Sequence, residues 1–298
     1  MRVCGFSFVR NAVRFDYPFV ESVRSALPLC DEFVLAVGES DDGTLERARG
    51  IDPAKVRIIE TRWDDSLRRG GAVLAQQTDV ALAEVRRRGC DWALYLQADE
   101  VLHERDHPAI RAAIETWRGD PLVEGLLFDY IHFCGGYGWI GEGRDWYRRE
   151  VRIVRPSVPG LASWKDAQGF RAERRKLRVK RIAATVYHYG WVKPPAVQQE
   201  KLRSFHRLWH PDGEIESLLE GGGGPSKGAD EYDYSTRGRL VPFHGTHPAA
   251  MRERVSLQDW AFDYDPRRAR ITPAHRFLDW IEIRTGRRLG EYRNYRLV

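Results

Sequence analysis

Short apolar runs of strand type alternate with stretches of helical periodicity over the first hundred residues. The apolar runs cover residues 3–9, 32–37, 56–60 and 92–96. Between them, apolar residues recur at helical spacing over 11–27, 42–50 and 70–88. This order predicts parallel strands joined by helices. Because the strands are apolar at nearly every position, rather than at alternate ones, we expect helices on both faces of the sheet.

The pattern changes after residue 99. A helix is predicted over 109–118, and strands over 125–132, 150–155 and 177–188. The stretch 133–147 is rich in glycine and aromatic residues, which is typical of a loop that faces a substrate. We take residues 1–194 as one sheet domain.

Residues 195–298 are interpreted as a C-terminal extension. A polar helix is predicted over 195–209, a flexible glycine-rich segment near 220–230, and a further helix over 273–285 in a tail rich in arginine and aromatic residues. The predicted fold class is therefore α/β. It has a mostly parallel sheet flanked by helices, followed by a mainly helical or irregular extension.

Composition excludes several classes of protein. The 298 residues include 48 Lys+Arg and 43 Asp+Glu, a net charge of +5, and 42% are hydrophobic. This balance is typical of a folded, water-exposed chain, and it disfavours a dedicated nucleic-acid binder. No apolar run approaches the ~18 residues of a membrane span, and residues 1–9 lack the pattern of a signal peptide. We expect a cytoplasmic protein whose arginines favour anionic ligands or an anionic surface.

The four cysteines are scattered. Cys4, Cys30, Cys90 and Cys134 form no CxxC pair, and their neighbours are largely apolar. They are interpreted as small buried hydrophobic residues of a reduced protein.

Polar residues follow each of the first four predicted strands. They lie at 10–11, 38–44, 63–65 and 97–100, and many are acidic. Parallel strands end at one edge of a sheet, where ligands bind in open α/β folds. Clustered carboxylates repel one another unless a metal ion or ligand donors hold them, and oxygen ligands suit Mg²⁺ or Mn²⁺ bound to phosphates.

Three common nucleotide or hydrolase motifs are absent from the sequence. No GxGxxG follows the first strand, no GxxxxGK[ST] occurs, and there is no GxSxG. If the chain binds phosphates, a metal ion and arginine side chains have to hold them.

Four segments in order resemble the family 2 glycosyltransferases, which have the GT-A fold. They read FVRN at 8–11, SDDGT at 40–44, GAVLAQQ at 71–77 and YLQADE at 95–100. The resemblance covers roughly residues 1–195. The later segments YHYGW at 187–191 and THP at 246–248 resemble an uncharacterised bacterial branch of the family.

The resemblance implies a nucleotide-diphospho-sugar donor, most commonly a UDP-sugar, and a divalent Mn²⁺ or Mg²⁺ ion. Glu39 and Asp42 match the family positions that hold the base and ribose. The donor-binding residues that it implies are Arg10, Asn11, Glu39, Asp42, Gly71, Gln77, Gln97 and Asp99.

The metal position departs from the family pattern. Asp99 matches the aspartate that contacts the metal, but Gln97 stands where the family has a second aspartate. An amide accepts a ribose hydroxyl without adding charge to the metal site. His188 matches a family histidine that serves as a metal ligand, and the alternative is a half-buried histidine bound to a backbone carbonyl.

An inverting transfer needs a carboxylate to remove the proton of the acceptor hydroxyl. In related branches this acid follows an R-x-x-R strand, and here Arg152 and Arg155 are followed by Asp166. Asp166 is the first candidate base and Asp145 the second, and the alternative for Asp166 is a surface residue paired with a neighbouring cation. Arg152 and Lys201 are candidates for neutralising the departing diphosphate.

The function predicted from this resemblance is transfer of a hexosyl or related group in cell-surface glycan synthesis. The acceptor is a glycan, a lipid-linked sugar or a protein. Two rivals remain: a nucleotidyltransferase, and a silent scaffold of the same fold, which Gln97 favours. The tryptophans at 139, 146 and 164 either stack on an acceptor or pack in the core. The basic C-terminus either contacts anionic lipid, peripheral to the inner membrane, or is a solvated face.

Overall fold

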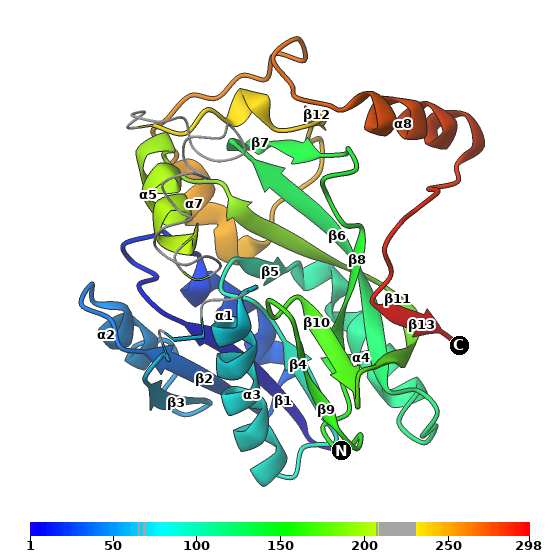
Figure 1. Cartoon of the computed structure of the whole chain (residues 1–298). Coiled ribbons are helices and arrows are strands. Elements are labelled where there is room, and N and C mark those ends of the chain that lie inside the picture. The colour runs from blue at the N-terminus through cyan, green and yellow to red at the C-terminus, as the bar shows by residue number, and fades with distance from the viewer. Residues whose placement is uncertain (65, 68–69, 207, 209–230) are drawn as a thin grey trace.

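A curled, mixed sheet runs through the molecule, with helices against both of its faces (Figure 1). The computed structural model describes residues 1–298 except 65, 68–69, 207 and 209–230. Within these ranges the strands are β1 (Val3–Val9), β2 (Glu32–Gly38), β3 (Val56–Thr61), β4 (Trp92–Tyr95), β5 (Glu100–Leu102), β6 (Gly125–Cys134), β7 (Gly136–Gly141), β8 (Arg149–Val154), β9 (Leu161–Trp164), β10 (Gly169–Ala172), β11 (Arg175–Trp191), β12 (Leu240–Pro242) and β13 (Tyr295–Leu297).

The helices of the described residues are mostly short, and along the sequence they lie between the strands. They are α1 (Phe19–Ala26), α2 (Thr44–Arg49), α3 (Ala72–Arg87), α4 (His107–Thr116), α5 (Pro195–His206), α7 (Arg252–Ser256) and α8 (Pro273–Thr285). The described residues also form the 3-10 turns η1 (Leu27–Leu29), η2 (Glu104–Asp106), η3 (Tyr234–Thr236) and η4 (Ala249–Met251).

The first four long strands form the predicted parallel unit in the order β3-β2-β1-β4. Strand β2 shows why its sequence is apolar throughout. Phe33 and Leu35 enter the core cluster that contains α1 and α4, whereas Val34 and Ala36 enter the cluster that contains α3. Both faces of the strand are therefore buried, and the predicted α/β class is confirmed.

The second half of the sheet is mixed. It continues from β4 through β8, β6, β11, β10 and β9, with β6 parallel to β11 and the other neighbours antiparallel. The strands predicted at 125–132, 150–155 and 177–188 are confirmed as β6, β8 and β11. The predicted loop 133–147 was partly wrong, since β7 occupies 136–141 and pairs with β6 and β12. The turn at Gly135, with φ of +77°, lets the chain reverse there.

The helix predicted over 11–27 is also shorter than expected. Only 19–26 is helical, because Asn11 and Asp16 have positive φ values of 50° and 48° and Pro18 precedes the first turn. The irregular segment 10–18 lies at the end of β1. It therefore provides loop residues, instead of a helix, beside the edge where a ligand was expected.

The C-terminal extension returns to the sheet. Strand β12 pairs with β7, and β13 pairs in parallel with β11. Met251 and Phe243 pack with Tyr187 and Tyr189 of β11. The predicted helix over 273–285 is confirmed as α8. The glycine-rich segment near 220–230 lies outside the described residues, as does the predicted end of the polar helix at 209.

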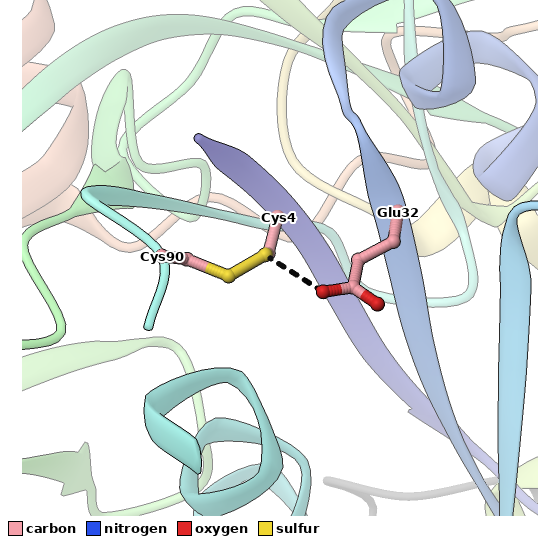
Figure 2. Close-up of side chains that lie close together, drawn as sticks. All are labelled: Cys4, Glu32 and Cys90. Atoms are coloured by element: carbon pink, nitrogen blue, oxygen red, sulfur yellow. Dashed lines mark hydrogen bonds between the residues drawn. A yellow bond between two sulfur atoms is a disulfide. The ribbon is translucent and has the colours of Figure 1, made fainter. Parts of the chain in front are cut away.

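All four cysteines are buried, as predicted, but two are not free thiols. Cys4 and Cys90 form a disulfide, with Glu32 beside it (Figure 2). The expectation of four reduced cysteines was wrong for this pair. Cys4 lies on β1 opposite Ala93 of β4, so the sheet brings Cys90 to a Cα–Cα distance of 5.9 Å despite a separation of 86 residues. Cys30 and Cys134 are free and buried.

Among the described residues, no helix is both long and apolar enough to cross a membrane.

Candidate functional site

A cavity of about 670 Å³ lies at the carboxyl ends of β1, β3 and β4, where the sequence predicted a ligand site. Lys201 and Arg237 line it. So do seven of the predicted site residues: Arg10, Asn11, Gln97, Asp99, Asp145, Asp166 and His188. They come from distant parts of the chain. The fold thus assembles one site from the strand ends, β11, the β9–β10 hairpin and α5.

Asp99 and His188 face each other in this cavity. Asp99 Oδ2 lies 3.7 Å from His188 Nε2 and 3.9 Å from Lys201 Nζ. Burial alone would raise the pKa of Asp99, but His188, Lys201 and Lys193 lower it well below its usual range. Asp99 is therefore an anion at neutral pH.

The second ring nitrogen of His188 is held by another histidine. His132 Nε2 lies 2.7 Å from the carbonyl oxygen of Tyr147, and its Nδ1 lies 3.0 Å from His188 Nδ1. A carbonyl only accepts, so His132 Nε2 carries the hydrogen. Burial and His188 hold the pKa of His132 well below its usual value, so the ring is neutral and its Nδ1 accepts from His188. With Nδ1 of His188 bound to His132, Nε2 is the ring nitrogen that lies on the side of Asp99.

Gly190 leaves open the space between these two groups. A Cβ atom at this position would lie 2.5 Å from Asp99 Oδ2 and 2.7 Å from His188 Nε2. A carboxylate oxygen and an imidazole nitrogen around an open space form a donor pair that suits Mn²⁺ and, less well, Mg²⁺. The residues therefore fit the divalent ion that the sequence resemblance implies.

The residue after Asp99 has a different environment. Glu100 is fully buried and receives two hydrogen bonds from Arg152, at 2.8 and 2.7 Å, and one from Tyr130 at 2.9 Å. Arg152 is also fully buried and does not line the cavity, so the suggestion that it neutralises a departing diphosphate was wrong. The pair instead anchors the 97–100 turn, because Glu100 Oε2 also accepts from the backbone amide of Gln97.

Gln97 connects that turn to the hairpin that carries Asp166. Its amide nitrogen donates to the carbonyl oxygen of Ala167 at 3.2 Å, and the buried hydroxyl of Tyr95 donates to the same oxygen at 3.2 Å. Lys165 and Ala167, on either side of Asp166, have positive φ values of 56° and 66°. The turn at 165–167 is thus held by the side chains of Gln97 and Tyr95.

The two candidate bases differ in their surroundings. Burial raises the pKa of Asp166, although amide hydrogen bonds oppose the shift. Asp145 is exposed and lies 3.6 Å from His275 Nδ1 of α8. Burial therefore favours Asp166 as the base.

The opposite end of the cavity is aromatic. Phe8 and Trp63 have ring centroids 5.9 Å apart, and the guanidinium of Arg10 lies 5.3 Å from the Trp63 ring. The indole nitrogen of half-buried Trp63 is itself buried and has no hydrogen-bond partner among the described residues. Asn11 donates its backbone amide to Ser40 Oγ at 3.0 Å, which joins the loops after β1 and β2. This end offers flat apolar surface of the kind that stacks on a base.

Four of the predicted donor residues lie outside the cavity lining. Glu39 is exposed and pairs with Arg62, and Asp42 accepts from the Thr44 and Arg14 amides. Gly71 caps α3 with a φ of +72°, and Gln77 is buried on that helix.

Cationic side chains border the cavity near Asp99. Lys201 donates to the carbonyl oxygen of Gly190 at 2.7 Å, and the guanidinium of Arg237 lies 3.6 Å from the centre of the Trp191 ring. Buried Lys193 donates to the carbonyl oxygen of Asp16 at 2.9 Å. Lys201 and Arg237 line the cavity and are positioned to meet an anionic ligand, whereas Lys193 is fully buried outside the lining.

Sequence reasoning missed His132, Gly190, Arg237 and the Glu100–Arg152 pair. His132 lies on β6 directly opposite His188 in the parallel register, so its role depends on strand pairing that a sequence does not display. Glu100 carried a signal, because a second carboxylate directly after Asp99 in a buried strand end requires a cationic partner.

A scan against protein-family models finds no match, and neither does a search of curated proteins. Several solved structures are similar. The crystal structure of S. aureus TarS is 12% identical, with a TM-score of 0.38; the match covers 76% of this chain and 45% of that one. TarS 1–349 in complex with UDP-GlcNAc is 15% identical, with a TM-score of 0.39, over 74% of this chain and 71% of that one.

A third similar structure is the mannosyltransferase PcManGT from Pyrobaculum calidifontis, in complex with GDP-Man and Mn²⁺. It is 22% identical, with a TM-score of 0.30, over 42% of this chain and 34% of that one. The present chain thus spans less than half the length of full TarS and about a third of PcManGT. Because these TM-scores are below 0.5, the function has to be inferred from the residues of the cavity.

Proposed function

We propose that this chain is a metal-assisted glycosyltransferase that moves a sugar from a nucleotide-diphospho-sugar to an acceptor hydroxyl. The observation that carries the proposal is the Asp99–His188 pair. The two groups face each other at 3.7 Å, beside the space that Gly190 leaves open, in a cavity that also contains Asp166.

The two ends of the cavity suit the two ends of the donor. A nucleobase stacks on the aromatic end, at Phe8 and Trp63. The diphosphate lies toward Lys201 and Arg237, the cations on the Asp99 side. UDP is the nucleotide that the sequence resemblance favours, and the binding assay below compares it with three others.

Asp99 and His188 would hold the divalent ion, Mn²⁺ or Mg²⁺. When bound, such an ion neutralises phosphate charge and so makes the nucleoside diphosphate a better leaving group. Asp99 provides the anionic ligand. His132 fixes His188 in the tautomer that offers Nε2, and Lys201 adds a positive charge to the diphosphate side.

Asp166 acts as the general base in an inverting transfer. Its carboxylate takes the proton of the acceptor hydroxyl as the hydroxyl oxygen attacks the anomeric carbon. The pKa of Asp166 is raised by burial, which increases its basicity. The acceptor is a hydroxyl group of a glycan, a lipid-linked sugar or a protein, in cell-surface glycan synthesis.

Gln97 no longer favours the silent-scaffold alternative. Its amide nitrogen donates to the Ala167 carbonyl and so holds the turn of Asp166. An aspartate at this position has no hydrogen to donate. The departure from the family pattern is therefore consistent with an active site.

The test is a thermal-shift panel of UDP, GDP, dTDP and CMP, each with and without Mn²⁺, on the wild type and Asp99→Ala. A nucleotide at about 100 times its Kd adds roughly 2.7 kcal/mol, which raises Tm by several degrees. We expect one nucleotide to do so only with both Mn²⁺ and Asp99. Equal binding with and without Mn²⁺ in both proteins would remove the metal from the proposal.

Product analysis then separates the classes of enzyme. Incubation with the sugar conjugate of the bound nucleotide should release the free nucleoside diphosphate. Release of pyrophosphate from a nucleoside triphosphate would instead indicate a nucleotidyltransferase. No turnover and no nucleotide binding would support a scaffold.

A further inference from the structure

Helix α8 presents apolar side chains to the solvent. Phe277, Trp280 and Ile283 are 61%, 52% and 68% exposed, and the first two have ring centroids 6.2 Å apart. They recur every three residues and therefore share one side of the helix. In Figure 1, α8 lies at the edge of the molecule, away from α1–α4. A large aromatic and aliphatic face in this position is costly to leave in water.

The polar side of α8 faces the protein. Asp279 pairs with Arg144 at 3.3 Å, and Glu282 pairs with Arg144 at 3.2 Å and with Arg148. Arg144 also donates to the Leu278 carbonyl at 3.0 Å and is only 7% exposed. The helix is therefore inverted relative to an ordinary surface helix, whose apolar side faces the core. Because these ion pairs hold it, rather than apolar packing, its apolar residues are left for another surface.

The exposed charged residues on α8 itself and directly after it are positive. Arg276 and Arg284 are exposed on the helix, and Arg287 is exposed just beyond its end. The guanidinium of Arg284 lies 4.9 Å from the Trp280 ring. The two acidic residues of α8 are 15% and 11% exposed and already bound to arginines, so they do not cancel this charge.

We propose that α8 docks on an anionic phospholipid surface, with Phe277, Trp280 and Ile283 in the headgroup region and the three arginines on lipid phosphates. An amphipathic helix with an aromatic face and flanking cations has this chemistry. A second copy of the chain is a poorer occupant, because two such faces would bring their arginines together. The proposal does not depend on the enzymatic activity.

Docking of α8 would also hold the cavity close to the lipid surface. His275, in the first turn of α8, lies 3.6 Å from Asp145, which lines the cavity. Arg144, the neighbour of Asp145, is the residue that holds the helix. The loop that borders the cavity is therefore attached to the membrane-docking helix.

The test is sedimentation of the full chain with two kinds of vesicle, pure phosphatidylcholine and a mixture with 30% phosphatidylglycerol. We expect binding to the anionic vesicles that weakens at high salt. Replacing Arg276, Arg284 and Arg287 by Gln should weaken binding about fivefold per arginine, or about 100-fold in total. Phe277→Gln/Trp280→Gln/Ile283→Gln should abolish binding to the anionic vesicles.

The matched control is Leu122→Gln/Leu257→Gln, which removes two leucines that are 57% and 67% exposed outside α8. This variant should bind as the wild type does. All variants change exposed side chains, so circular dichroism and Tm should stay unchanged and exclude misfolding. Equal binding by the apolar α8 variant would overturn the proposal. The absence of vesicle binding by the wild type would also overturn it. If light scattering then shows a wild-type dimer that the apolar α8 variant converts to monomer, the face binds a second copy of the chain instead.

Discussion

Two acidic segments lie at the same edge of the sheet, one after β2 and one after β4, and their carboxylates have different environments. After β2, Asp42 accepts from the Arg14 amide at 2.7 Å and from the Thr44 hydroxyl at 2.6 Å. After β4, Asp99 faces His188 across the space beside Gly190. The carboxylate of Asp42 is satisfied by hydrogen bonds from the adjacent loops. The carboxylate of Asp99, in contrast, is charged, largely buried and directed into a cavity.

This difference shows which carboxylates of an acidic sheet edge are available to a ligand. Asp42 stabilises the loops that form the edge, because its hydrogen bonds join the segment after β1 to the start of α2. Even adjacent residues differ in this way, since Glu100 is saturated by Arg152 and Tyr130 while Asp99 is not. Whether a carboxylate is available to a ligand thus depends on side chains from other strands.

The largest effect is expected at Asp166, the proposed general base. Asp166→Asn should lower kcat by about 10²–10⁴-fold, because the amide cannot accept the proton of the acceptor. Nucleotide binding in the thermal-shift assay should be unchanged. Asp145→Asn is the matched control and should keep most of the activity. If the two variants exchange these phenotypes, Asp145 is the base.

The next effect concerns the saturated neighbour of Asp99. Glu100→Gln leaves Arg152 as a buried cation without its anion, and it should reduce the free energy of unfolding by about 3–5 kcal/mol. Denaturant unfolding measures this loss. Asp145→Asn is the comparison, because its exposed carboxylate pairs with no buried arginine, and it should cost much less stability. Equal losses would contradict the division between structural and available carboxylates.

A smaller and more selective effect is expected at Gly190. Gly190→Ala places a methyl group between Asp99 and His188, and it should weaken Mn²⁺ binding about tenfold or more. Calorimetric titration of Mn²⁺ measures this directly. Gly138→Ala is the control, because a Cβ atom there would meet no atom within 4 Å. Wild-type Mn²⁺ affinity in Gly190→Ala would exclude the proposed ion site.

Much of the fold was predictable from local sequence. The parallel unit, α8 and most strand positions follow from periodicity, which depends on each segment alone. The short strands β5, β7, β9, β10, β12 and β13 were missed because three to six residues carry too little pattern. The Cys4–Cys90 disulfide was missed because strand order, not spacing, brings the two residues together.

The site was predictable only in part, for the same reason. Asp99, Asp166 and His188 were predicted by motif to belong to one site, and all three line the cavity, while their roles stay predictions. His132 and Gly190 act through register and free space, which exist only after β6 and β11 have paired. Arg152 was misassigned, because a sequence does not distinguish an arginine that saturates a buried glutamate from one that faces a ligand.

The smallest effect is expected at Asp42, and its pH dependence identifies the cause. Burial alone would raise the pKa of Asp42, but hydrogen bonds from Arg14 and Thr44 lower it overall. A lowered pKa in the folded state adds stability above the unfolded value, about 3.9, and this stability is lost as pH falls through the folded value. Asp42→Ala should therefore cost about 1 kcal/mol at pH 7, and less below about pH 4. Thermal unfolding at both pH values measures the difference. Loss of nucleotide binding in this variant at unchanged Tm would instead make Asp42 a ligand-binding residue, as the family resemblance implies, and the contrast with Asp99 would disappear.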